Sequence, residues 1–401
     1  MLNTSESSKE QKIPAIWRQA FRPFFLFGGI FSILSISTWA TVLAGKFYFT
    51  PYGGLTFWHA HEMLFGFVAA IIAGFLLTAV QNWTGLRATH GKSLITLFSL
   101  WLIARIFMLF GAWSYSWITT LIDISFLPLT AFFMARLVLK VKQYRNLVFV
   151  PILLLLATAN LLSHVSVITG DTHFYTQSIY GTVMTITLVM TLITGRVVPM
   201  FTANGTKTTK VENLPWLEKL TIGSTAILFL IHFANMQTIL PSQLLALLFL
   251  LCSLSHSIRA IRWRPHITFN TPLVWSLHLA YWFIPTSFLL FSLHYMGVTI
   301  SASNALHGLT AGAISSLILS MIARISLGHT GRPLTPHWIT KYAFSLIILA
   351  GSMRMFSAHI QMYFLFNLHI LSAALWALAF GIYVVVYIPI LTSPRPDGKP
   401  G

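Results

Sequence analysis

The chain has 401 residues, of which 56% are apolar and only 8% are charged. A soluble domain typically has about 25% charged residues, so this composition excludes an ordinary soluble enzyme and a disordered chain. Lys and Arg nevertheless number 25 against 8 Asp and Glu, which gives a net charge of +17. The single cysteine, Cys252, excludes an intrachain disulfide and any metal site built on a pair of cysteines.

Apolar runs follow one another along the chain after a polar start. A bilayer core about 30 Å thick needs about 20 apolar residues per helix. The sequence therefore predicts an all-α, polytopic integral membrane protein with about twelve transmembrane helices. These lie near residues 24–44, 59–80, 93–111, 116–139, 147–168, 173–200, 216–236, 240–260, 272–296, 303–327, 338–356 and 361–391.

The domain organisation follows from this count. We expect a cytoplasmic tail at 1–23, a single transmembrane helical domain at 24–391 and a second cytoplasmic tail at 392–401. No small-residue cleavage site follows the first apolar run, so we interpret it as a retained helix.

The basic residues predict the orientation. With the N-terminus inside, every Lys and Arg except Lys46, Arg105 and Arg354 falls in a cytoplasmic segment. This asymmetry predicts that both termini are cytoplasmic. The positive charge then faces anionic lipid, so we expect the lipid bilayer as a partner and no nucleic acid.

Three ionisable side chains lie inside predicted spans: Glu62, Arg105 and Asp123. Charges in a membrane are costly and are usually paired or functional. Arg105 and Asp123 fall at similar depth on consecutive antiparallel helices. They are expected to form an ion pair, and the alternative is a path for a proton or a ligand.

Glu62 belongs to the segment Trp58-His59-Ala60-His61-Glu62-Met63. Glu62, Gly66, Ala70 and Gly74 recur every four residues, and His59 joins this face. Such a small-residue face admits a neighbouring helix or a flat macrocycle. His61 is expected on a different face if the helix has already begun. Two histidines and a carboxylate at a span end favour a metal or proton role over ordinary hydrogen bonding.

Other histidines recur near span ends. His164 and His307 are expected on the outer side, and His307 adjoins a small-residue stripe at Gly308 and Gly312 that suits helix packing or a porphyrin. His278 is expected nearer the cytoplasm, and His329 lies in a cytoplasmic turn. Arg196 and Arg332 could pair with haem propionates, although membrane orientation explains them equally well.

Several segments together resemble the NnrS family. They are Phe21-Arg22-Pro23-Phe24-Phe25, Trp58-His59-Ala60-His61-Glu62-Met63, Asn82-Trp83-Thr84-Gly85, Gly195-Arg196-Val197-Val198-Pro199 and Arg324-Ile325-Ser326-Leu327-Gly328-His329-Thr330-Gly331-Arg332. The resemblance implies a multi-pass protein of the bacterial cytoplasmic (inner) membrane. It also implies haem b, copper and a role in denitrification or in tolerance of nitric oxide (nitrosative) stress. His59, His61, Glu62, His164, His278, His307 and His329 lie in segments that match the family pattern.

We therefore hypothesise a haem- and copper-binding membrane protein. The candidate metal ligands are His59, His61, His164 and His307 in the outer half, with His278 on the inner side. Glu62 is the candidate proton donor or acceptor, or it orients a ligating histidine.

Two other function classes stay open. One is a transporter or channel for a small solute or metal, and the other is a non-enzymatic sensor or assembly factor for haem or copper. Six candidate histidines match the number in haem–copper oxidoreductases, so an oxidoreductase-like activity also stays open. The paired-histidine copper motif of those enzymes is absent, which argues against oxygen or nitric oxide reductase activity. A redox role would need an electron donor, a quinol or a cytochrome, and the sequence specifies neither.

Overall fold

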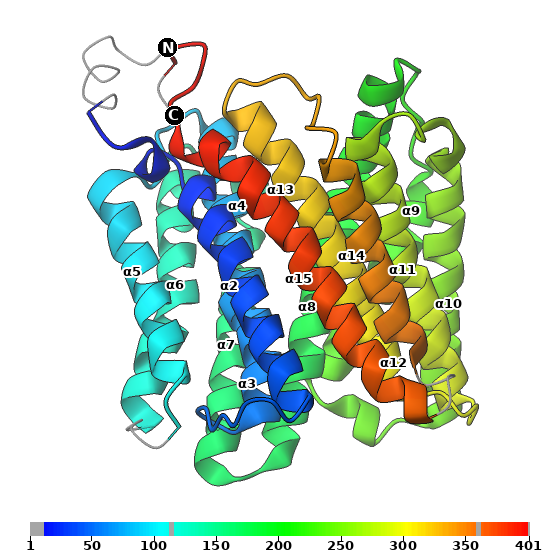
Figure 1. Ribbon diagram of the computed structural model, residues 1–401. Coiled ribbons are helices and arrows are strands. Elements are labelled where there is room, and N and C mark those ends of the chain that lie inside the picture. Colours follow the sequence, from blue (N-terminus) through cyan, green and yellow to red (C-terminus); the bar gives the residue numbers. More distant parts are fainter. Residues whose placement is uncertain (1–11, 112–115, 358–361, 400–401) are drawn as a thin grey trace. The chain divides into compact units, whose positions relative to one another are not determined.

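The computed structural model describes residues 12–111, 116–357 and 362–399. The chain is 80% helical, and these residues contain no strand. Twelve helical spans cross the fold (Figure 1). Ten are single helices: α2 (Phe21–Leu43), α5 (Gly91–Met108), α6 (Ser116–Lys140), α7 (Phe149–Thr169), α8 (Thr172–Thr206), α9 (Pro215–Phe233), α10 (Ser242–Arg262), α11 (Pro272–Tyr295), α14 (Thr340–Phe356) and α15 (Met362–Thr392).

The other two spans each consist of three helical segments. One runs through α3 (Leu55–His61), η2 (Glu62–Val68) and α4 (Ala69–Thr84), and the other through α12 (Ala302–His307), η6 (Gly308–Ile314) and α13 (Ser315–His329). Both η2 and η6 are π-helices, in which the backbone hydrogen bonds reach five residues instead of four.

The all-α membrane fold predicted from the sequence is confirmed. Eleven of the spans are long and apolar enough to cross a bilayer, and the twelfth, α14, has 17 residues. Residues 1–11 of the predicted tail, and parts of the predicted loops near 111–116 and 356–361, lie outside the described residues. The cytoplasmic placement of both termini stays a prediction.

The helices group into two compact units. The single transmembrane domain expected from the sequence stays a prediction. Unit 1 comprises residues 1–179, 324–335 and 380–401, and unit 2 comprises 180–323 and 336–379. Each unit is considered by itself below.

Unit 1 is built on aromatic packing between α2 and its neighbours. The Phe24 ring lies 6.0 Å from Phe98 and 6.4 Å from Trp101, both on α5, and 5.6 Å from Phe126 on α6. Arg22, at the start of α2, donates to the carbonyls of Leu391 and Ser393, each at 2.8 Å. Figure 1 shows α2 in blue and the α5–α6 pair in cyan. These contacts hold the helices on which the buried charges lie.

In unit 2, α10 packs against α11, and both α11 and α14 pack against η6. Helices α8 and α11 continue through Pro199 and Pro285, although proline removes a helical hydrogen bond. The departures from regular α-helix in the two composite spans are π-helices.

The two composite spans are built alike. In each, a short α-helix ends at a histidine, His61 or His307, and a seven-residue π-helix follows at once. The fifth residue of each π-helix is a glycine, Gly66 or Gly312. The preceding span packs a phenylalanine against each glycine: a Cβ on Gly66 would collide with Phe31 of α2, and one on Gly312 with Phe283 of α11.

The likeness continues through the following helices. Each composite span is followed by a helix with an arginine near its last turn, Arg105 of α5 or Arg354 of α14. Asp123 lies seven residues after the start of α6, and His369 lies seven residues after the start of α15. We infer that α2–α6 and α11–α15 are two copies of one four-span arrangement. The copies share element lengths and a few positions rather than a run of residues, so no repeat is visible in the sequence.

Gly351 tests the packing of the second copy. A Cβ at this position would lie 2.6 Å from Gly312 Cα and 2.8 Å from the Ala311 carbonyl oxygen, both backbone atoms. Gly351→Ala should therefore lower stability by about 1–3 kcal/mol, although alanine is the better helix former.

The matched control is Gly223→Ala on α9, where an added Cβ meets nothing within 4 Å. This variant should keep or raise the melting temperature of the purified protein in detergent. Equal melting temperatures for the two variants would contradict the close contact between α14 and η6.

Candidate functional site

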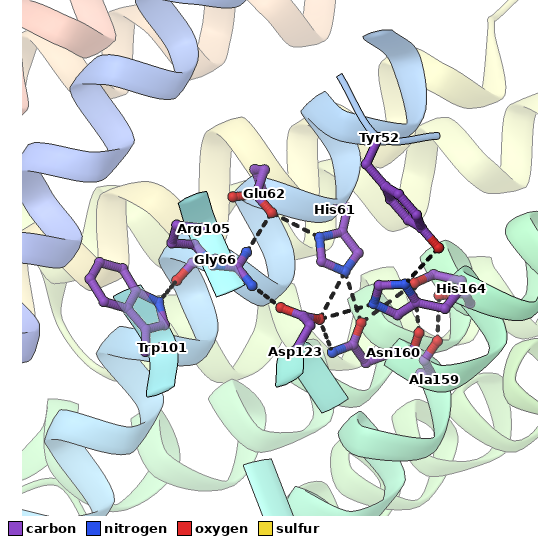
Figure 2. Close-up of polar contacts among 12 residues, drawn as sticks. Tyr52, His61, Glu62, Gly66, Trp101, Arg105, Asp123, Ala159, Asn160 and His164 are labelled. Carbon is purple, nitrogen blue, oxygen red and sulfur yellow. Dashed lines mark hydrogen bonds and ion pairs between the residues drawn. The ribbon is translucent and has the colours of Figure 1, made fainter. Parts of the chain in front are cut away.

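Unit 1 contains a buried polar cluster in which several spans each supply side chains (Figure 2). His61 closes α3 and Glu62 opens η2, while Arg105 comes from α5, Asp123 from α6 and His164 from α7. None of these five residues is more than 4% exposed. Such a concentration of titratable groups among apolar helices is costly unless each group is partnered.

Arg105 is the cation at the centre of the cluster. One of its terminal nitrogens, Nη1, pairs with Glu62 Oε1, and the other, Nη2, pairs with Asp123 Oδ1. The predicted Arg105–Asp123 ion pair is confirmed, and Glu62 shares the same guanidinium. One positive and two negative groups leave a net charge of −1, which a further cation would neutralise.

The second Asp123 oxygen meets two imidazoles. Asp123 Oδ2 lies 3.2 Å from His61 Nε2 and 3.1 Å from His164 Nε2. These three atoms lie within 4.8 Å of one another, so one ion could contact all of them. Two histidines and a carboxylate form a donor set that binds transition metals.

The outer nitrogen of each imidazole has its own partner. His61 Nδ1 lies 2.9 Å from Glu62 Oε1, and His164 Nδ1 lies 3.2 Å from the Tyr52 hydroxyl. Burial raises the pKa of Tyr52, so this phenol stays protonated at neutral pH. A hydroxyl can donate or accept, which lets Tyr52 serve either tautomer of His164.

Asn160 ties the cluster together from α7. Its Nδ2 donates to Asp123 Oδ2 at 2.6 Å, and its Oδ1 lies 2.9 Å from His61 Nε2. Both ring nitrogens of His61 therefore face oxygen acceptors, Asn160 on one side and Glu62 on the other.

Gly66 makes room for the ion pairs. An added Cβ there would lie 2.9 Å from Arg105 Nη1 and 3.2 Å from Glu62 Oε2. The Trp101 indole donates to the Gly66 carbonyl at 2.8 Å, so α5 is tied to the π-helix one turn before Arg105. The small residue predicted to admit a neighbour thus admits the guanidinium and the Phe31 ring, not a macrocycle.

The structure brings His61, Glu62 and His164 together but places other candidates elsewhere. The His59 ring stacks on Trp39 with centroids 4.2 Å apart, whereas His61 lies beside Glu62. His59 thus packs against α2, as Gly66 and Gly74 do, and the contact of His61 with Glu62 was not predicted. His307 belongs to unit 2, where its Nδ1 donates to the Ser303 carbonyl at 2.7 Å.

The candidates predicted on the inner side each have their own surroundings. His278 of α11 is buried, with Nε2 2.8 Å from Thr202 Oγ1. The His329 ring lies 5.7 Å from Phe21, and its carbonyl accepts from Arg395. Arg196 is exposed on α8, and burial lowers the pKa of Arg332. His278 and Arg196 belong to unit 2, whereas His329 and Arg332 belong to unit 1.

Several members of the cluster were missed or undervalued in the sequence. Asn160 precedes His164 by four residues, so helical spacing could have placed it on the same face. Asp123 was expected to pair with Arg105 but not to approach two histidines. Tyr52 lies in a loop and carried no sequence signal.

Comparison with known proteins gives one match. The model of the NnrS protein family matches residues 15–395. No curated protein matches the sequence.

The ion pairs predict a stability effect. Arg105→Gln leaves Glu62 and Asp123 buried without their cation, which should cost about 3–5 kcal/mol. The measurement is the melting temperature of the purified protein, with Arg145→Gln, an exposed arginine, as the control. Equal melting temperatures in the two variants would show that the buried pairs do not support the fold.

Proposed function

Because the chain belongs to the NnrS family of nitric-oxide-related membrane proteins, we propose that it binds copper in the bacterial cytoplasmic membrane. Its role would lie in denitrification or in the response to nitric oxide (nitrosative) stress. The observation that supports this proposal is the convergence of His61, His164 and Asp123 on one buried point.

The residues of the cluster fit a copper ion in chemistry and in charge. Neutral imidazole nitrogens suit copper, and the carboxylate adds a charged oxygen donor. The net charge of −1 on the ion pairs favours a bound cation. Each would-be ligand also has an orienting partner: Glu62 for His61, Tyr52 for His164 and Arg105 for Asp123.

The side chains of the cluster would have different roles. His61, His164 and Asp123 would hold the metal, while Glu62 would accept or return the proton of His61 Nδ1. Bound copper would supply one-electron redox chemistry and a position for a small ligand. The surrounding apolar helices would keep bulk water from the site.

The haem b implied by the family resemblance fits less well. The two small-residue stripes expected to face a porphyrin are covered by Phe31 and Phe24 in unit 1 and by Phe283 in unit 2. Among the candidate ligands outside the cluster, His278 has Nε2 engaged with Thr202. We therefore assign no step to haem.

Metal analysis tests the copper assignment. Purified protein loaded with copper should hold about one ion per chain and should melt at a higher temperature than the metal-free protein. His61→Ala and His164→Gln should lose most of both effects. Glutamine at position 164 keeps a polar side chain for Tyr52 and Asp123 but removes the imidazole.

His59→Ala is the matched control, because this histidine stacks on Trp39 outside the cluster. It should keep the copper content and the stabilisation by copper. Loss of copper in this variant, or its retention in His164→Gln, would overturn the assignment. A Soret band that disappears with copper in His164→Gln would also contradict it, since this band reports haem.

The paired π-helical spans favour a second candidate function, a transporter for a metal ion or small solute. Discontinuous helices in repeated elements are a feature of many transporters. Proteoliposomes containing the protein would then take up copper faster than empty liposomes, and Asp123→Asn would abolish the difference. Bound copper without uptake would exclude copper transport.

A further inference from the structure

The second copy of the four-span arrangement keeps an arginine but lacks the carboxylates. Arg354 corresponds to Arg105 near the end of its helix. Gly308 stands where the first copy has Glu62, and His369 stands where it has Asp123. The guanidinium of Arg354 therefore lies among neutral groups.

The contacts of Arg354 are long and weak. Its Nη1 lies 3.3 Å from Asn304 Oδ1 and 3.4 Å from Ser357 Oγ, and its Nη2 lies 3.4 Å from Ser303 Oγ. Typical charge-assisted hydrogen bonds are about 2.7–2.9 Å long. This half-buried guanidinium is thus held by three neutral oxygens at the outer limit of hydrogen bonding.

No described carboxylate balances this charge. Glu62 and Asp123 pair with Arg105, Glu218 pairs with Arg259, and Asp397 pairs with Arg395. Asp171 and Glu212 make no ion pair with Arg354 among the described residues. The sequence between Ala358 and Asn367 also contains no Asp or Glu.

The groups around Arg354 add unused donor capacity. Asn304 is only 5% exposed, and its Nδ2 is buried without a hydrogen-bond partner among the described residues. His369 Nε2 lies 3.1 Å from Ser357 Oγ, which places an imidazole beside the same hydroxyl. A buried amide donor left unpaired next to an unbalanced cation points to an acceptor that carries negative charge.

We propose that Arg354, Asn304, Ser303, Ser357 and His369 form a binding site for a small monovalent oxyanion. The guanidinium presents parallel N–H donors that match two oxygens of a planar anion such as nitrite or nitrate. The Asn304 amide would supply a further donor. One positive charge suits a monovalent anion better than sulfate, and the fork favours oxyanions over chloride.

Isothermal titration of the full-length protein with nitrite and nitrate tests the site. Both anions should bind saturably, and chloride and sulfate should bind more weakly. Arg354→Gln should weaken nitrite and nitrate binding by about ten-fold or more, because it removes the charged donor. Arg145→Gln, which changes an exposed arginine, should leave binding unchanged.

A second variant keeps the test decisive if Arg354→Gln fails to fold. Ser303→Asp places a carboxylate beside Arg354 Nη2 at an exposed position and should abolish anion binding by supplying the missing counter-charge. No saturable binding of either anion by the unmodified protein, binding that persists in Ser303→Asp, or chloride bound as tightly as nitrite would overturn the proposal. His164→Gln should bind the anions normally, so failure of the copper assignment would be seen separately.

Discussion

The shared guanidinium of Arg105 is the interaction on which unit 1 depends. It pairs with two carboxylates that would each be very costly to bury alone. By holding Glu62 Oε1 and Asp123 Oδ1, it leaves the opposite edge of Asp123 to the imidazoles. The same contact therefore stabilises the helices and orients Asp123 toward His61 and His164. The contacts that stabilise the helices here are therefore also the contacts that position the candidate metal ligands.

The π-helix explains how adjacent residues can serve one site. His61 ends a regular helix and Glu62 begins the wider turn, and their side chains meet at 2.9 Å. Widened turns of this kind often occur at functional sites. A π-helix also follows His307 in the second copy. One copy carries acids around its arginine, and the other carries neutral donors.

The sequence predicted the helices well because span length and the distribution of Lys and Arg depend on the bilayer rather than on tertiary contacts. It also predicted Glu62, Arg105 and Asp123 as significant, since charge in a membrane requires a reason. It could not predict that His61 would contact Glu62, because the π-helix that begins at Glu62 changes the angular spacing of the side chains there. The contact of Tyr52 with His164 could not be predicted, because a tyrosine in a loop belongs to no periodic pattern.

The hydrogen bond from Trp101 to the Gly66 carbonyl has a practical consequence. The indole lies one turn from Arg105 and is bonded to the backbone one turn after Glu62, so it spans both sides of the ion pair. Indole emission depends on hydrogen bonding and on nearby charge. Trp101 is therefore a built-in fluorophore for the cluster, and the difference spectrum between the protein and its Trp101→Phe variant would follow the state of this interior without any added label.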